Sequence, residues 1–368
     1  MAQALYRKYR PKKLEDVLGQ ETNVQILKNA AKTGRIGQAY IFYGPRGTGK
    51  TTSARLLAKL LNCEKRRTDP KFAELGEPCN VCTACREIDE QNSFDVIEID
   101  AASNRGIDEI RNLKESIRTA PASGGSKIYI IDEAHMLTGA AWNALLKTLE
   151  EPPKHAVIVL ATTEFEKLPP TITSRAQRFV FKKIPKAAIM GKLATEAKAE
   201  KIKIDEPALE LIAAIAEGSF RDAESLLEQI ASMGGAITLA DVERITGRTG
   251  LGKVAEFAGI VIRKDLKAAI AALSALNDEG ANPVQFTKDL IHYLRRVLSL
   301  KLNPELEKMF ERDLTKDEVS AVKKMGEAAD AAFLVALEKS FIRAYAEMRY
   351  SPFAATPLEI ALVENLKS

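Results

Sequence analysis

Cysteine is scarce in this chain of 368 residues and is confined to one short segment. The four cysteines are Cys63, Cys79, Cys82 and Cys85, and no cysteine follows them. In a reducing compartment, a cluster of this kind favours a metal site over a pair of disulfides. The cysteine pattern therefore argues against an extracellular protein that is stabilised by disulfide bonds.

Long apolar runs are also missing. The basic opening, from Arg7 to Lys13, is not followed by the apolar stretch of a secretory signal. No later run reaches the roughly 18–20 apolar residues that a membrane span requires. We therefore expect a cytoplasmic protein without a membrane partner.

Neither sign of charge dominates the composition. The net charge is +4, a balance that permits contact with nucleic acid without arguing for it. There is one tryptophan, and 46% hydrophobic with 28% charged residues is typical of an ordered, helix-rich protein. We find no low-complexity tract or internal repeat, and the length predicts two or three domains.

The first half of the chain alternates strand-like and helical patterns. Residues 21–32 have the apolar spacing of a helix that ends at Gly34. Short runs rich in Ile, Val, Phe and Tyr predict strands at residues 39–43, 94–99, 127–131, 156–161 and 177–181. This alternation predicts a parallel sheet covered by helices. After about residue 184 only helical spacing remains, and Pro185 and the glycines at 247, 250 and 252 are candidate boundaries.

A glycine-rich motif follows the first strand. Residues 44–51, Gly-Pro-Arg-Gly-Thr-Gly-Lys-Thr, fit the phosphate-binding pattern G-x-x-x-x-G-K-[ST] between a strand and a helix. Its glycines let backbone N–H groups face phosphate oxygens, and the helix N-terminus attracts the same anion. We expect Lys50 to reach the β- and γ-phosphates and Thr51 to bind Mg²⁺. The predicted nucleotide contacts in this motif are Gly44, Pro45, Arg46, Gly47, Thr48, Gly49, Lys50, Thr51 and Thr52.

Two acids end the strand predicted at residues 127–131. Asp132 would lie at the carboxyl edge of the sheet and hold magnesium, and Glu133 would act as general base toward the attacking water. His135 completes the letters D-E-A-H, but four letters are weak evidence for a helicase, and we expect His135 to be a surface or packing residue. Thr162 and Thr163, at the next strand end, could hydrogen-bond the water or the γ-phosphate.

The cysteine spacing supplies four thiolates, the number that a closed tetrahedral zinc site requires. One ligand, Cys63, precedes a C-x2-C-x2-C run, so the metal would tie the end of the phosphate-loop helix to an insertion at about residues 63–90. The rival interpretation is an iron–sulfur site, since the run is similar to the start of a ferredoxin motif. No Cys-Pro follows Cys85 at the required distance, which disfavours that rival.

Five segments together resemble the gamma/tau subunit family of the bacterial DNA polymerase III clamp loader, AAA+ ATPases related to replication factor C. They are YRKYRPKKLEDVLGQE, GPRGTGKT, IDEAHMLTGAAWNALLKTLEEPP, LATTEFEKLPPTITSRAQRF and EGSFRDAESLLEQ. The resemblance covers residues 1–245 at the level of motifs. Beyond about residue 250 it rests on helical character alone.

The resemblance implies further site residues. Arg175 matches an arginine finger that acts in trans on a neighbouring subunit's ATP. Ala176 stands where the family usually has cysteine, a change that leaves this assignment in place. Thr163 matches a sensor at the strand end, and Arg221 a second sensor directed at the γ-phosphate. The segments around Tyr9 and Val17 correspond to the region that borders the adenine.

The resemblance also implies a fold and partners. The expected fold is an α/β P-loop AAA+ domain with a zinc-binding insertion (1–182), a helical lid (183–246) and an all-α collar (247–368). The expected function is ATP-driven opening of a sliding clamp and its placement on primed DNA, within DNA polymerase III but without polymerase chemistry in this chain. Expected cofactors are ATP, Mg²⁺ and Zn²⁺.

Expected partners are other subunits of a hetero-pentameric ring, the clamp and primed DNA. Single-strand-binding protein and the polymerase core would be contacted by regions outside this chain, and the protein would be associated with the bacterial nucleoid. Two other functions remain open: a ring helicase or branch-migration motor, and a zinc-bearing scaffold that holds nucleotide without hydrolysing it. The intact Lys50, Asp132 and Glu133 argue against the scaffold.

Overall fold

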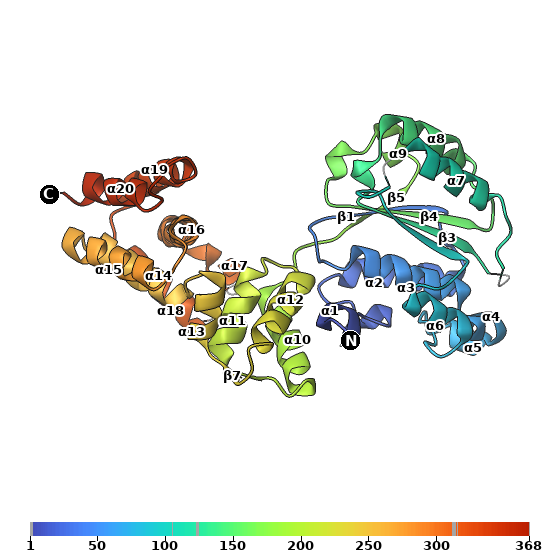
Figure 1. Ribbon diagram of the computed structural model, residues 1–368, viewed down its shortest axis with the longest axis horizontal. Helices are drawn as coiled ribbons and strands as arrows, with labels where there is room; N and C mark the ends of the chain where they lie inside the picture. Colours follow the sequence, from blue (N-terminus) through green and yellow to red (C-terminus); the bar gives the residue numbers. More distant parts are fainter. Residues whose placement is uncertain (1–2, 105, 123–124, 311–313, 315, 368) are drawn as a thin grey trace. The chain divides into compact units, whose positions relative to one another are not determined.

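The computed structural model describes residues 3–104, 106–122, 125–310, 314 and 316–367. The chain forms two compact units. The first consists of Met1–Ile184 and Gly218–Asp222, and the second of Pro185–Glu217 and Ala223–Ser368. Each unit is described by itself (Figure 1). The division into three domains at residues 182 and 246 stays a prediction.

A five-stranded parallel sheet forms the centre of the first unit, with the strand order β2-β3-β4-β1-β5. The strands are β1 (Ala39–Tyr43), β2 (Val96–Asp100), β3 (Lys127–Asp132), β4 (Ala156–Thr162) and β5 (Gln177–Val180). The inner strands are nearly continuous apolar runs because helices cover both of their faces. Tyr43 pairs with Thr162, and Ile131 pairs with Leu160, so β1, β3 and β4 present their carboxyl ends at one edge.

Helices lie on both faces of this sheet (Figure 1). One face packs against α2 (Glu21–Thr33) and α3 (Lys50–Asn62), with Tyr40, Phe42 and Phe179 among its core side chains. The other face packs against α7 (Ile107–Ile117) and α8 (Gly139–Glu150), whose Trp142 and Leu145 are buried against strand residues. The remaining helices of this unit are short: α1 (Leu5–Lys8), η1 (Leu14–Asp16), α4 (Glu64–Thr68), α5 (Pro70–Ala73), α6 (Thr83–Glu90), η2 (Ala134–Met136), η3 (Phe165–Lys167) and α9 (Pro170–Thr173).

The second unit is almost entirely helical. Helix α12 (Phe220–Ala231) begins in the first unit and continues in the second. The other elements are α10 (Lys186–Ala199), β6 (Lys203–Ile204), α11 (Glu206–Ile215), β7 (Ala236–Ile237), α13 (Leu239–Thr246), α14 (Leu251–Ile262), α15 (Leu266–Asp278), α16 (Pro283–Leu302), η4 (Pro304–Leu306), α17 (Glu307–Phe310), α18 (Lys316–Ala328), α19 (Ala331–Met348) and α20 (Thr356–Leu366). Helices α14 to α20 share one apolar core, in which Phe257 meets Phe286 edge to face.

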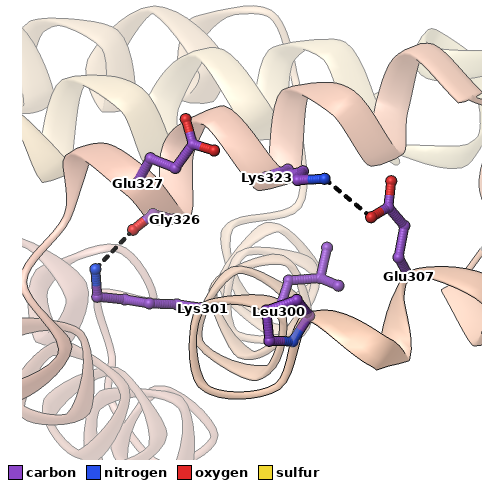
Figure 2. Close-up of a pocket in the computed structure, with 7 residues that line it drawn as sticks. Leu300, Lys301, Glu307, Lys323, Gly326 and Glu327 are labelled. Atoms are coloured by element: carbon purple, nitrogen blue, oxygen red, sulfur yellow. Dashed lines mark hydrogen bonds and ion pairs between the residues drawn. The ribbon is translucent and has the colours of Figure 1, made fainter.

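A pocket of about 200 Å³ lies among α16, η4, α17 and α18 in the second unit (Figure 2). Lys301 donates a hydrogen bond of 3.0 Å to the carbonyl of Gly326, and Lys323 pairs with Glu307 at 3.0 Å. Both cations at this pocket are thus used to hold neighbouring elements together. We assign no chemistry to it.

The α/β fold predicted from the sequence is confirmed, with two corrections. The strand expected at 94–99 begins at Val96, because Phe94 lies outside the sheet with 85% of its surface exposed. The chain after residue 184 is not purely helical, since β6 and β7 pair in parallel over two residues each. Among the described residues, no helix is both long enough and apolar enough to cross a membrane.

Candidate functional site

The glycine-rich loop joins β1 to α3 in the expected strand–loop–helix context. Gly44, Gly47 and Gly49 all have positive φ angles, of 144°, 71° and 100°. A Cβ on Gly44 would lie 2.0 Å from the carbonyl oxygen of Phe181, and one on Gly47 would lie 1.8 Å from Oγ of Ser219. The backbone therefore needs glycine at these positions for space as well as for conformation.

Lys50 is the first residue of α3, and its side chain folds back over the loop. Its Nζ donates hydrogen bonds to the carbonyls of Gly44 (2.8 Å) and Pro45 (2.7 Å). Burial lowers the pKa of this ammonium group, and the charges of Glu133 and Asp132 oppose that shift. Thr48 also donates to the Pro45 carbonyl, at 2.8 Å. Lys50 is thus a buried cation held by groups that phosphate oxygens could replace.

Thr51 connects the loop to the end of β3. Its hydroxyl donates a hydrogen bond of 2.8 Å to Oδ2 of Asp132. Burial raises the pKa of the Asp132 carboxyl, opposed by this bond and by the N–H of Glu133. A threonine hydroxyl and a carboxylate are the oxygen ligands that Mg²⁺ prefers. The two motifs predicted separately from the sequence therefore form one site.

Glu133 and Thr163 lie together at the ends of β3 and β4. Oε2 of Glu133 accepts hydrogen bonds from the Thr163 N–H (3.2 Å) and hydroxyl (3.0 Å). Glu133 has a φ of 47°, in the left-handed region that is uncommon for residues other than glycine. Strained backbone of this kind is concentrated at functional sites.

Of the two roles expected for His135, surface or packing residue, the structure agrees with packing, and the side chain also makes polar contacts. Its side chain is 6% exposed. Nδ1 lies 2.9 Å from Oγ1 of Thr162 and 3.4 Å from Oε2 of Glu133, while Nε2 lies 3.1 Å from Oε1 of Glu164. The sequence contains no spacing signal for these contacts, because the partners come from two different strand ends.

Two segments border the glycine-rich loop. Val17 is buried, and its Cγ1 would lie 3.7 Å from a Cβ on Gly49. At the start of α12, the Phe220 N–H donates to the Gly47 carbonyl at 3.1 Å. Arg221 is next in sequence, with its guanidinium 5.1 Å from the centre of the Tyr6 ring. Tyr9 is half-buried just after α1, with the ammonium of Lys8 5.7 Å from its ring centre.

Arg175 is held away from the loop. Its guanidinium donates to the Thr171 carbonyl at 2.6 Å and pairs with Glu150 at 2.7 Å. The side chain is 36% exposed. None of these partners belongs to the phosphate loop or to the ends of β3 and β4, and the action of Arg175 in trans stays a prediction.

The four cysteines converge although they are spread over the end of α3 and the insertion. Their sulfur atoms all lie within 4.8 Å of one another, and the four thiols are free. Sγ of Cys79 accepts from the N–H groups of Val81 (3.5 Å) and Cys82 (3.3 Å), and Sγ of Cys63 accepts from the Cys79 N–H at 3.3 Å. Four sulfurs with N–H donors directed at them form a donor set that suits a metal ion.

The pKa values of the cysteine thiols are shifted in different directions. Burial opposes ionisation of Cys79, but the N–H groups of Val81 and Cys82 outweigh it and lower the pKa of this thiol to about 7. Burial raises the pKa of Cys63 and of Cys85. A bound cation would reverse these two shifts, since it stabilises thiolates directly.

Lys59 fastens the insertion to α3, a contact that the sequence interpretation missed. Its side chain is 1% exposed, and Nζ donates to Oδ1 of Asn80 at 3.0 Å and pairs with Asp89. A lysine inside the apolar run of residues 56–61 is a signal that could have indicated a buried, paired cation.

Models of protein families match almost the whole chain. The model described as DNA polymerase III, delta subunit, matches residues 19–185. The clamp loader subunit ATPase lid domain of DNA polymerase III matches residues 188–236. The model of domain III of DNA polymerase III subunits gamma and tau matches residues 237–367.

Individual relatives agree with these matches. The chain is 42% identical to DNA polymerase III subunit tau of Bacillus subtilis over 363 residues, which cover 98% of this chain and 63% of that protein. It is 40% identical to the tau subunit of Escherichia coli over 303 residues, 82% of this chain and 46% of that one. The chain thus spans about half to two thirds of the length of these relatives.

Among solved structures, the clamp loader delta protein of Bacillus subtilis aligns with 94% of this chain and 99% of its own, with a TM-score of 0.40 and 16% identity. We draw nothing from a likeness at that level. The DNA polymerase III subunit gamma of Buchnera aphidicola is more informative, because it is 34% identical over 360 residues, 98% of this chain and 95% of that one. Identity along nearly the whole of both chains, joined to the three adjoining family matches, shows that this chain belongs to the gamma/tau family of DNA polymerase III subunits.

Proposed function

We propose that this chain is an ATP-hydrolysing subunit of a bacterial replicative clamp loader. ATP binding would open the sliding clamp, and hydrolysis on primed DNA would release it. The chain would bring no polymerase chemistry of its own to the holoenzyme. The observation that carries the proposal is the Thr51–Asp132 hydrogen bond, which joins the phosphate loop to an acidic strand end beside Lys50 and Glu133.

The residues at the carboxyl edge of the sheet would each have a separate role in ATP hydrolysis. The loop N–H groups of residues 46–51 and the N-terminus of α3 would bind the phosphates, with Thr52 in the first turn. Lys50 would exchange the carbonyls of Gly44 and Pro45 for the β- and γ-phosphate oxygens. Glu133 would accept the proton of the attacking water, whose oxygen bonds to the γ-phosphorus as the bond to ADP breaks. The magnesium ion, held by Thr51 and Asp132, would neutralise phosphate charge when bound.

Two arginines would complete the site in the assembled protein. Arg221 would leave the ring of Tyr6 for the γ-phosphate. Arg175 would release Glu150 and stabilise charge on the transferred phosphoryl group in a neighbouring subunit. Both side chains are exposed and held by weak surface contacts, which supports their being available to move. Tyr9 and Val17 would border the adenine.

The cysteine cluster would hold a structural zinc ion through Cys63, Cys79, Cys82 and Cys85. Four thiol ligands leave no open position for a substrate, and the contacts of Lys59 tie the cluster to the phosphate-loop helix. The metal would supply cross-linking of the insertion and would take no part in hydrolysis.

The chain would work in a hetero-pentameric ring with other clamp-loader subunits, acting on the clamp and primed DNA at the nucleoid. Regions beyond this chain would contact the polymerase core and single-strand-binding protein. An assembly of this kind uses ATP through differential affinity, since the nucleotide-bound ring favours the open clamp and hydrolysis withdraws that preference.

The rate of ATP hydrolysis with and without clamp and primed DNA tests the proposal. The assay uses the chain assembled with its partner subunits. We expect clamp and primed DNA together to raise the rate. If the rate of ATP hydrolysis does not change when the clamp is added, and the protein unwinds duplex DNA processively, the function is that of a helicase or branch-migration motor.

A further inference from the structure

We infer that His135 is a positioning residue for hydrolysis, an assignment that rests on the proposed ATPase function. His135 locks the end of β4 to the turn after β3. Thr163 can then hold one oxygen of the Glu133 carboxylate while the other stays available to the attacking water.

Both ring nitrogens of His135 have partners. Nε2 lies 3.1 Å from Oε1 of Glu164, a carboxylate that only accepts. Nδ1 lies 2.9 Å from Oγ1 of Thr162, and which of these two atoms donates depends on the tautomer of the ring. Both nitrogens are thereby satisfied in a side chain that is only 6% exposed. A ring fixed at both nitrogens acts as a brace between its two partners.

These contacts of His135 restrict the backbone of the segment that contains Thr163. Thr162 is fully buried, and its Oγ1 also accepts the N–H of Glu164 at 3.1 Å. The ring of His135 therefore contacts the side chain of the residue on each side of Thr163. This arrangement fixes the segment that presents the N–H and hydroxyl of Thr163 to Glu133.

The two carboxylate oxygens of Glu133 therefore differ in their hydrogen bonding. Oε2 of Glu133 accepts both Thr163 bonds and lies 3.4 Å from Nδ1 of His135. Within the described part of the chain, no hydrogen bond reaches Oε1 of Glu133. A base held through one oxygen keeps the other oxygen in a defined place, and small misplacements of a catalytic group cost large factors in rate.

The test compares His135→Ala, His135→Gln and Thr162→Val in the assembled loader with clamp and primed DNA. We expect His135→Ala to lower kcat for ATP hydrolysis about tenfold and to leave the Kd for ATP within about twofold, since the bonds to phosphate are untouched. Glutamine also has a donor and an acceptor, so we expect His135→Gln to bond again to Glu164 and Thr162 and to recover part of the rate.

Thr162→Val removes the hydroxyl group that bonds to Nδ1 of His135 and preserves the shape of the side chain at position 162. It should lower kcat to a similar extent, and the double variant should be no slower than either single one, because both changes break one connection. His155→Ala removes a histidine whose ring forms a hydrogen bond of 3.0 Å with the Ile117 carbonyl, just before β4 begins, and is the matched control. It should keep the wild-type rate.

Unchanged kcat in His135→Ala and Thr162→Val, with turnover still abolished in Glu133→Gln, would overturn this inference and leave the proposed function intact. Equal effects on kcat and on ATP affinity would also overturn it, since they indicate a general structural role. If His135→Ala fails to fold, the glutamine and valine variants carry the same comparison. Absence of ATP turnover in the wild-type assembly would contradict the proposed function itself.

Discussion

The hydroxyl of Thr51 donates a hydrogen bond of 2.8 Å to Oδ2 of Asp132, 81 residues away along the chain. The parallel register explains this contact, because β1 and β3 lie on either side of β4 and end at the same edge. We propose that this hydroxyl and this carboxylate supply oxygen ligands to a phosphate-bound magnesium ion.

Replacing Arg175 should separate hydrolysis from binding. Arg175→Ala removes the cation that would stabilise a neighbour's transition state, so the rate stimulated by clamp and DNA should fall at least about a hundredfold. ATP affinity should stay nearly unchanged, because the bonds of Arg175 within the described part of the chain go to Thr171, Ser174 and Glu150 and not to its own phosphate loop. Steady-state turnover and fluorescent-nucleotide titration measure the two quantities.

Glu150→Ala is the control for Arg175, since it breaks their ion pair and keeps the guanidinium. It should retain stimulated turnover, because an exposed pair contributes little. Equal loss of turnover and of ATP affinity in Arg175→Ala would refute its action in trans.

Replacing Cys82 should lower stability and leave the chemistry of the folded protein intact. Cys82→Ser removes one of the four thiols proposed to hold zinc, at a half-buried position, so zinc content should fall and the melting temperature should drop by several degrees. Metal analysis and thermal unfolding check this, with Val81→Ala as the exposed neighbouring control. An unchanged melting temperature with lost ATP turnover would contradict a structural role for the cluster.

Glu196 should make the second unit less stable as the pH rises. Its side chain is 2% exposed, and neither carboxylate oxygen has a hydrogen-bond partner among the described residues, although Nζ of Lys192 lies 3.5 Å from Oε1. Burial and the nearby charge of Glu224 raise its pKa from 4.5 to about 8. Between these values the folded state binds a proton that the unfolded state does not, so the free energy of unfolding decreases with rising pH.

Glu196→Gln should therefore reduce this decrease and raise the melting temperature at pH 8 relative to wild type. Melting curves from pH 5 to pH 9 measure the slope. Exposed Glu256→Gln is the control and should leave the wild-type slope unchanged. An identical slope in Glu196→Gln would show that the buried carboxyl is not its source.

The sequence predicts those parts of the site that depend on local pattern. The loop from Gly44 to Thr51 is recognisable because its glycines and Lys50 occur at fixed spacing. Asp132 is recognisable because it ends a buried run. The brace of His135 and the contact of Lys59 with Asn80 are not predictable in this way, because their partners are brought together only by strand order and by the fold of the insertion.

The ends of the strands are also not predictable from local sequence pattern alone. The pattern at 94–99 is apolar enough for a strand, but pairing with β3 selects Val96–Asp100 and leaves Phe94 outside. The β6–β7 pair has two residues in each strand, too few for any periodic signal.

ATP turnover by Glu133→Gln, in the complete clamp loader with clamp and primed DNA, tests the central claim most directly. Glutamine preserves the shape of Glu133 and its contact with Thr163 but cannot accept the proton of the attacking water. We predict that ATP and the clamp still bind while turnover falls at least about a hundredfold. Turnover within twofold of wild type would contradict the claim that this edge of the sheet hydrolyses ATP.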